Sequence, residues 1–396
     1  MPVSNGVADR LRIGFVTIHG ADDRSAYSGS AYAMRQAFRD HRDVEITDID
    51  DLATFLYPLW RAKQAAYWFG FGKRYWMNRQ PAVLERYARQ VAKKTTSAGP
   101  LDLLLSPSSI PLSRYTGSIP TAFWSDATFD CLADFYPEAS DFARETVAAG
   151  HRMEADSLRN CSLAVYSSAW ALESAATVYG APRSKLETVP YGANIDPLIG
   201  PSDVEALISK RLKGPPRLLF IGSHWQRKGG DIAVATAAEL VRRGRPVELD
   251  IVGCVPPMRM PGFVAVHGFL NKQSAAGRAR LADLFRSAHM LLLPTRADCV
   301  PMVIAEAYAH GLPVAAADVG GVATVVEDGV TGRLLGRAAD APAWATAVEE
   351  ILAPPDRYTA RATAALAHFR RELNWPSAVD RVVRILQARQ ISSRAA

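Results

Sequence analysis

The sequence contains few cysteines, and none belongs to a recognisable pair. Its 396 residues include four, Cys131, Cys161, Cys254 and Cys299, with no CxxC spacing and no short-range cluster. This scarcity argues against a disulfide framework and against a zinc site, and it favours a reducing compartment.

Long apolar runs are missing as well. No stretch of 18 apolar residues occurs, and the amino-terminal MPVSNGVADR lacks the apolar core of a signal peptide. We therefore expect a cytoplasmic protein, with peripheral contact at the inner membrane face as an option. The formal charge of +6 suits an anionic ligand, a nucleotide or an acidic membrane surface, or it is dispersed solvated charge. No nucleic-acid-binding motif is present.

Short apolar runs alternate with stretches of helical period along the whole chain, which predicts an α/β fold. The runs lack polar–apolar alternation, as expected for parallel strands covered on both faces. Expected strands in the first half are 12–18, 101–106, 120–124, 162–167 and 187–190. Those in the second half are 217–222, 247–253, 263–268, 289–294 and 313–318. Expected helices include 30–39, 142–159, 169–179, 231–243, 276–287 and 341–352.

The alternating pattern restarts near residue 217, after the Gly- and Pro-rich segment YGANIDPLIGPSD. We expect two Rossmann-like, doubly wound parallel-sheet domains facing each other across a ligand cleft. The predicted boundaries are 1–195 for an acceptor-binding domain and 196–376 for a donor-binding domain. The amphipathic stretch within 377–396 is predicted to be a helix that packs back on the first domain.

An anion site is predicted where the second domain begins. The strand RLLFIG leads into a loop that ends Arg227-Lys228-Gly229-Gly230, and a helix is expected from Asp231. Free backbone N–H groups at a helix start, together with two cations, can bind a phosphate. An Arg-Lys pair in a loop is also often solvated surface, but its position at a strand's carboxyl end favours phosphate binding.

A carboxylate stands inside an apolar helix in the segment DCVPMVIAEAYAHGLP. Glu306 is surrounded there by apolar residues, and a buried carboxylate is costly unless it is paired. The helix is expected to start at Pro301, so the N–H groups of Met302 and Val303 lack intrahelical partners. Asp298 lies in the preceding loop. These groups can meet phosphate or hydroxyl groups, or Glu306 pairs with a structural arginine and Asp298 caps the helix.

Together these segments resemble the family-4 retaining glycosyltransferases, which have two Rossmann-like domains in the GT-B arrangement. The matching pieces are FIGSHWQRKGG, VHGFL, LLLPTRADCVPMVIAEAYAHGLPVAAADVGG, DGVTGRLL, the linker region LAVYSSAWALESAATVYGAPRSKLETVPYGANID and SGSAYAMRQAF. They occur in the expected order over most of the chain. The resemblance implies transfer of a sugar from a nucleoside diphosphate to a hydroxyl acceptor.

The resemblance also assigns roles in the donor site. Glu306 matches the second glutamate of the family's signature, which implies hydrogen bonds from the donor ribose. Asp298 replaces the first glutamate, one methylene shorter, and is expected near the donor sugar. Lys228 matches the phosphate-binding lysine. Ser223 stands where relatives have an arginine, so Arg227 is expected to share that role.

Further positions follow from the same resemblance. Gly29 fits the family's glycine loop after the first strand, where backbone approaches the ligand. Asp126 follows the strand PTAFW and is expected to hold a donor-sugar hydroxyl, or to act as a loop cap. The nucleobase is expected along His267, Gly268, Phe269 and Leu270. Pro301 replaces a common glycine and removes one N–H from the anion site.

Residues 55–81 hold nine aromatic residues and five Lys or Arg. This mixture suits an interfacial membrane segment or a lipid-linked acceptor groove. It also suits helices whose rings fill the core and line the acceptor site, which we favour.

The predicted function is therefore a retaining hexosyltransferase-type enzyme. Its partners are a nucleotide-diphosphate sugar and a glycan or lipid-linked acceptor, and no metal or other cofactor is expected. Two rivals remain. A nucleotide-sugar epimerase on the same fold would need an acid–base set, for which His224 is the well-placed histidine. A non-catalytic nucleotide-sugar binding protein is the other, suggested by Asp298 and Ser223.

Overall fold

A computed structural model describes residues 10–54, 57–133, 135–136, 141–195, 200–212 and 215–389. The chain divides into two compact units, the first within Met1–Tyr191 and Trp375–Ala396 and the second within Gly192–Asn374. The predicted boundary at 195/196 and the final residues of the predicted carboxy-terminal helix, 390–396, border or enter segments outside the described residues.

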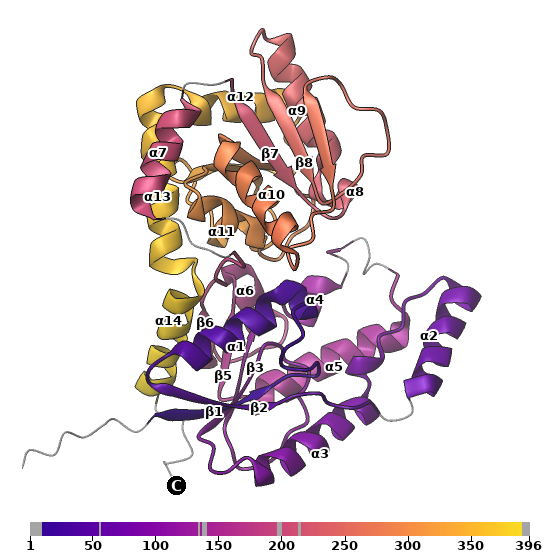
Figure 1. The fold of residues 1–396 in the computed structure, drawn as a ribbon. Helices are drawn as coiled ribbons and strands as arrows, with labels where there is room; N and C mark the ends of the chain where they lie inside the picture. Colours follow the sequence, from indigo (N-terminus) through magenta and orange to yellow (C-terminus); the bar gives the residue numbers. More distant parts are fainter. Residues whose placement is uncertain are drawn as a thin grey trace, which may run out of the picture. The chain divides into compact units, whose positions relative to one another are not determined.

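The described part of the first unit is a six-stranded parallel sheet flanked by helices (Figure 1). The strand order is β2-β1-β3-β4-β5-β6, so the chain reverses its direction of winding between β1 and β3. The strands are β1 (Leu11–Val16), β2 (Val44–Ile49), β3 (Leu103–Ser106), β4 (Thr121–Ser125), β5 (Leu163–Tyr166) and β6 (Leu186–Thr188). The helices are α1 (Ser30–Asp40), α2 (Tyr57–Phe71), α3 (Pro81–Ser97), α4 (Phe129–Leu132), α5 (Arg144–Asn160), α6 (Ala169–Thr177) and α14 (Trp375–Ala388).

The second unit repeats this architecture over its described residues. Its parallel sheet has the order β12-β11-β10-β7-β8-β9, with the reversal between β7 and β10. The strands are β7 (Arg217–Ile221), β8 (Glu248–Val252), β9 (Val264–Gly268), β10 (Met290–Leu293), β11 (Val314–Ala317) and β12 (Gly332–Leu335). The helices are α7 (Pro201–Arg211), α8 (Trp225–Lys228), α9 (Gly230–Arg242), α10 (Ala275–Ser287), α11 (Met302–Ala309), α12 (Ala341–Leu352) and α13 (Pro355–Glu372).

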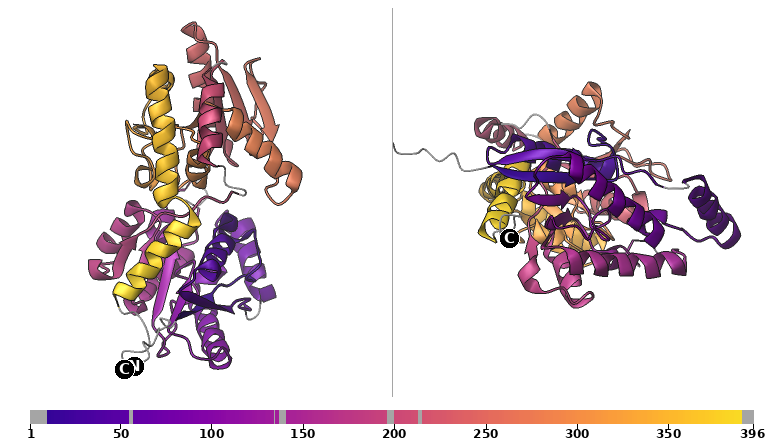
Figure 2. Two further views of the ribbon diagram at one scale, coloured as in Figure 1. Left: turned by 60° about the vertical axis from the view of Figure 1, so that its left-hand side comes forward. Right: turned by 90° about the horizontal axis from the view of Figure 1, so that it is seen from below.

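The first unit is built from two separate pieces of chain. The last helix, α14, packs on α1 in the first unit (Figures 1 and 2). Its first residue, Trp375, lies with ring centroids 5.8 Å from Trp124 and 5.5 Å from Tyr191. Trp124 is fully buried at the end of β4. The carboxy-terminal helix therefore completes a core that the amino-terminal residues begin.

The aromatic-rich segment corrects in part the prediction that its rings fill the core, since Tyr75 is buried and Trp60 packs against the core but the other rings of α2 do not. Helix α2 has no buried residue among those described, and it lies at the edge of the first unit (Figure 2). Within the stretch after α2, Tyr75 is buried and supplies the ring on which the helix rests. Of the basic residues, Lys63 lies over the buried Tyr75 ring at 4.6 Å, and Arg79, after the helix, lies over the buried Phe129 ring at 5.5 Å.

No helix in the described part of the chain is long and apolar enough to cross a membrane. The four cysteines are all described, are buried and form no disulfide with one another.

Candidate functional site

The reversal point of the second sheet brings together two predicted residues. Lys228 ends α8, just beyond β7, and Asp298 lies in the loop after β10, the strand hydrogen-bonded to β7. The Lys228 ammonium forms a short ion pair with the Asp298 carboxylate. Both side chains are largely buried. In doubly wound sheets the carboxyl ends of the strands at this reversal are where ligands bind, so the pair stands at the expected place.

Two glycines make this approach possible. A Cβ on Gly222 would lie 2.7 Å from the Lys228 Cβ, so a side chain there would displace the lysine. Gly229 has φ +77°, and a Cβ on it would lie 2.0 Å from the Pro294 carbonyl oxygen. The glycines of the predicted loop therefore serve close packing of two chain segments. The loop itself is a short helical turn, α8, rather than open chain.

A second ion pair fastens the two loops to each other. Arg296 donates two hydrogen bonds to Asp231, at 2.8 and 2.7 Å, and its backbone N–H donates to the Arg227 carbonyl at 2.7 Å. The hydrogen bond from Arg296 is the main reason that the pKa of the Asp231 carboxyl is lowered. The Arg227 guanidinium donates to the Ala297 carbonyl at 3.1 Å. Arg227 thus lies beside the Asp298 loop, and its shared phosphate role stays a prediction.

Glu306 is buried, as predicted, and the structure gives it a lysine partner. Its side chain is 1% exposed on α11, and the Lys272 Nζ lies 2.5 Å from its Oε1. Lys272 follows β9 and is itself 46% exposed. The alternative that Glu306 pairs with a structural arginine is therefore wrong, because the cation that pairs with it is a lysine of the same chain. The contact of Glu306 with a ribose stays a prediction.

The amino-terminal end of α11 lies between these carboxylates. The helix begins at Met302 rather than at Pro301, which is its N-cap with φ −73° and ψ 110°. The N–H groups of Met302 and Val303 belong to the first turn, where no intrahelical acceptor exists. Val303 is buried and Met302 is partly exposed.

The predicted nucleobase segment ends β9. Gly268 has φ +63°, and the following Phe269 is strongly exposed while Leu270 is partly buried. The preceding His267 is held by the buried Asp250 at 2.7 Å. The segment therefore presents a turn of backbone with one exposed ring, next to a histidine that is hydrogen-bonded to Asp250.

The reversal point of the first sheet carries a strained turn. Tyr27, Ser28 and Gly29 all have positive φ, of 51°, 57° and 87°, and Gly29 is the N-cap of α1. For Tyr27 and Ser28 this conformation is unfavourable, and such strain concentrates at functional sites. The Tyr27 hydroxyl and Ser108 Oγ, after β3, are hydrogen-bonded at 3.1 Å.

Asp126 lies exposed at the carboxyl end of β4 in the same unit. Burial raises the pKa of Tyr27, and the Asp126 charge adds to this effect. Burial lowers the pKa of Arg79 to about 10, while Glu154, Tyr27 and Asp126 oppose the shift. Gly29 and Asp126 therefore border one cluster of polar groups. That they share a site with Lys228 stays a prediction.

Sequence reasoning missed Lys272, Arg296 and the Arg79–Glu154 cluster. Lys272 and Arg296 lie in loops after strands, which was the available signal, but charged loop residues are common. Among the described residues, no group of three or more His, Cys, Asp or Glu could hold a metal ion. That no metal is required stays a prediction.

The fold and the reversal-point geometry define a two-unit Rossmann-like α/β protein, which confirms the predicted fold class. Residues 215–354 match the family described as glycosyl transferases group 1. A D-inositol 3-phosphate glycosyltransferase of Gordonia bronchialis is 31% identical over 221 residues, 52% of this chain and 47% of the relative. The chain spans about half the length of the curated relatives it matches.

Solved structures resemble both units. Sucrose-phosphate synthase of Thermosynechococcus elongatus gives a TM-score of 0.67 at 17% identity, covering 96% of this chain and 99% of that one. Anabaena HepE, solved in complex with UDP and glucose, gives 0.60 at 18% identity, covering 96% and 100%. These likenesses show the GT-B fold.

Proposed function

We propose that this protein is a retaining glycosyltransferase that moves a sugar from a nucleoside diphosphate to a hydroxyl acceptor. The observation that carries the proposal is the Lys228–Asp298 ion pair at the reversal point of the second sheet. At this place the cation can bind the diphosphate of a nucleotide-sugar donor, and the carboxylate can bind a hydroxyl of its sugar. The family match over residues 215–354 and the UDP and glucose bound by HepE support this assignment.

The proposed chemistry concerns the charge of the leaving group. When the bond between sugar and diphosphate breaks, negative charge grows on the diphosphate. Lys228, Arg227 and the N–H groups of Met302 and Val303 would stabilise that charge, and preorganised donors of this kind are worth several kcal/mol in general. Asp298 would accept a hydrogen bond from a sugar hydroxyl, and Glu306 from the ribose.

The ion pair prepares Lys228 for this task. Asp298 compensates the ammonium charge while no donor is bound, which keeps a largely buried cation from standing alone. A diphosphate oxygen then competes for the same ammonium, and a sugar hydroxyl replaces the lost partner of Asp298. The pair would therefore exchange one contact for two when the donor binds.

The acceptor remains open in chemical detail. We assign the predicted acceptor role to the first unit, with Gly29 and Asp126 on the sugar side. Since the curated relatives are named for D-inositol 3-phosphate, phosphorylated polyols belong in an acceptor panel beside glycans and lipid-linked sugars. A cytoplasmic location remains a prediction.

The test measures donor consumption and product formation by Lys228→Ala and Asp298→Asn. We expect Lys228→Ala to lose turnover by about 100-fold or more, because it removes the leaving-group cation. Lys210→Ala, a change at an exposed lysine of α7, is the matched control and should retain activity. Near-parent activity of Lys228→Ala would contradict the proposed phosphate role.

Asp298→Asn separates sugar contact from helix capping. It should depress turnover of the intact donor while the affinity for the nucleoside diphosphate, measured by calorimetry, changes little. Asp298→Glu restores the family residue and should keep some activity. Full activity of the Asn variant would remove Asp298 from the reaction. Donor conversion without acceptor would indicate an epimerase, and binding without turnover over the whole panel a binding protein.

A further inference from the structure

Helix α2 rests on the first unit through one narrow face. Tyr67 stacks on the buried Tyr75 with centroids 5.3 Å apart, and Trp60 stacks on the same ring at 6.3 Å. Lys63 reaches Glu145 of α5 at 2.7 Å, and Gln64 donates to the Tyr75 carbonyl at 2.9 Å. These residues recur every three or four positions and so mark one side of the helix.

The opposite side of α2 is apolar at its centre. At 100° per residue the positions facing away from Tyr75 are Pro58, Ala62, Ala65 and Phe69, all exposed, with Ala66 and Arg61 at the two borders. Phe69 is 85% exposed, and Phe71 at the helix end is 73% exposed. A helix with one anchored face and one exposed apolar face offers a docking surface, because isolated exposed rings are ordinary but an extended apolar face is not.

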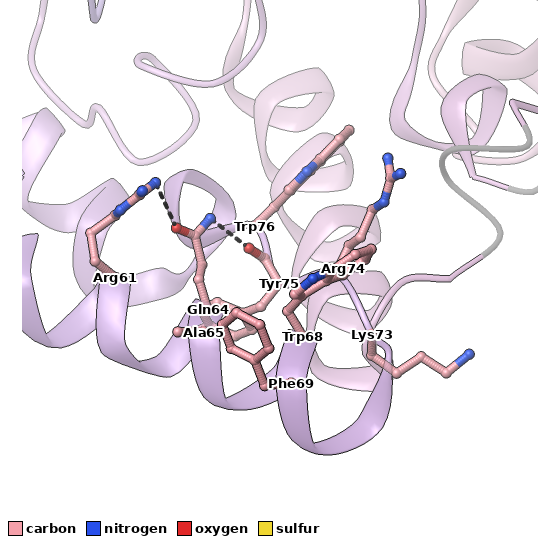
Figure 3. A pocket seen from close by; sticks show the side chains of 9 residues that line it. All are labelled: Arg61, Gln64, Ala65, Trp68, Phe69, Lys73, Arg74, Tyr75 and Trp76. Carbon is pink, nitrogen blue, oxygen red and sulfur yellow. Dashed lines mark hydrogen bonds between the residues drawn. The ribbon is translucent and has the colours of Figure 1, made fainter.

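Basic groups border this face. Arg61, Lys73 and Arg74 line a hollow of about 370 Å³ together with Trp68 and Phe69 (Figure 3). Lys73 lies 3.7 Å from Asp141, whereas the Arg61 guanidinium donates to the neutral Gln64 and Arg74 lies over the Trp68 ring. No Asp or Glu occurs in the sequence between Asp51 and Glu85.

We propose that α2 is a membrane-docking helix that lies in the surface of an anionic bilayer. Aromatic rings enter the boundary between headgroups and acyl chains, and flanking basic residues contact anionic headgroups, which is the arrangement of interfacial helices. This inference is independent of the donor chemistry proposed above. It goes beyond the sequence expectation, which favoured burial of these rings.

Charge decides between a bilayer and a second copy of the chain. A twofold contact through this face would place the basic border of one copy beside that of the other, because a symmetric interface pairs like patches. No acidic side chain of α2 could compensate that charge. An anionic lipid surface compensates it directly and accommodates exposed rings of different size.

The test is flotation of the full chain with vesicles of phosphatidylcholine alone or with 40 mole per cent phosphatidylglycerol, at low and high salt. The parent should float with the anionic vesicles at low salt only, since salt screens the attraction. Phe69→Ser should reduce the partition coefficient at least about tenfold, and Arg61→Ala and Arg74→Ala about fivefold each.

Matched controls keep the outcome specific. Met258→Ser, at a residue 61% exposed in the second unit, and Arg42→Ala, at an exposed arginine after α1, should leave partitioning unchanged. Phe69→Ser should keep the parent Tm, because its ring is exposed. Absence of parental flotation, or equal flotation by Phe69→Ser, would overturn the proposal. A dimer in gel filtration that Phe69→Ser converts to monomer, without vesicle binding, would assign the face to a second copy instead.

Discussion

Glu154 is a buried carboxyl group in the first unit that no predicted role uses. It lies on α5, 1% exposed, and accepts hydrogen bonds from Ser109 at 2.9 Å and from Tyr166 at 3.4 Å. Burial raises its pKa from the ordinary value of 4.5 to about 7, against the lowering effects of Ser109 and Arg79. Ionising Glu154 at neutral pH therefore costs the folded protein free energy.

The sign of the pH effect follows from that shift. Between about pH 4.5 and 7 the folded chain holds a proton on Glu154 that the unfolded chain has released, so stability falls as pH rises through this window. Glu154→Gln removes this component, worth on the order of 3 kcal/mol. The Tm difference between variant and parent should grow from pH 5 to pH 8. Glu205→Gln, at an exposed residue, is the control, and a pH-independent difference for Glu154→Gln would contradict the buried-charge account.

Individual site residues could be predicted, but their mutual contacts could not. Lys228, Asp298 and Glu306 were chosen from position after strands and from one charge in an apolar helix, and the structure places them at one end of the second sheet. The Lys228–Asp298 contact depends on strand order, which pattern alone does not supply. Lys272 was not predicted because its local sequence does not distinguish it from a solvated surface lysine.

At the scale of elements, the interior strands were predictable, and so were the edge strands β6 and β9, but the other two edge strands were not. Ten expected strands correspond to observed ones, whereas β2 and β12 were missed. Each lies at an edge of its sheet. Their burial patterns include mostly half-buried positions, so neither VEITDI nor GRLL is a continuous apolar run. Prediction from continuous apolar runs therefore fails for a strand whose positions are mostly half-buried and whose sequence is interrupted by polar residues or glycine.

The turn between α8 and α9 should be intolerant of a side chain. Gly229→Ala places a methyl group against the Pro294 carbonyl, whereas Gly244→Ala, at a similar φ of +74°, meets nothing within 4 Å. The two variants share the backbone strain and differ in the clash. We expect Gly229→Ala to be less stable than Gly244→Ala by about 1–3 kcal/mol in chemical denaturation. Equal stabilities would show that the loops after β7 and β10 separate without cost.

At the scale of the whole molecule, one unit is continuous in sequence and the other is not. The chain enters and leaves the second unit side by side, since the Ala193 N–H donates to the Leu373 carbonyl at 2.9 Å. Tyr191 and Trp375 likewise stack in the first unit. Cleavage of the chain just before α14 therefore removes part of the first unit and no part of the second unit.

Fragments should reveal this asymmetry. Residues 192–374 alone should unfold cooperatively and, on the proposed function, bind a nucleoside diphosphate. Residues 1–191 alone should show no cooperative transition, because Trp124 and Tyr191 lose their contacts with Trp375. Joining 191 to 375 through a short Gly-Ser linker should restore it, since these ends are adjacent. Circular dichroism during heating provides the measurement, and a cooperative 1–191 fragment would contradict the expectation.

The return of α14 to the first unit also sets an order of events during synthesis on the ribosome. Domains usually fold as they emerge, the amino-terminal one first. Here the first unit must wait for residues 375–389, which are translated after the entire second unit. The nascent chain therefore carries an unfinished amino-terminal sheet while the later-made unit closes. Chaperones that bind exposed nascent segments would therefore bind the amino-terminal residues of this protein, and would release them only after α14 has been translated.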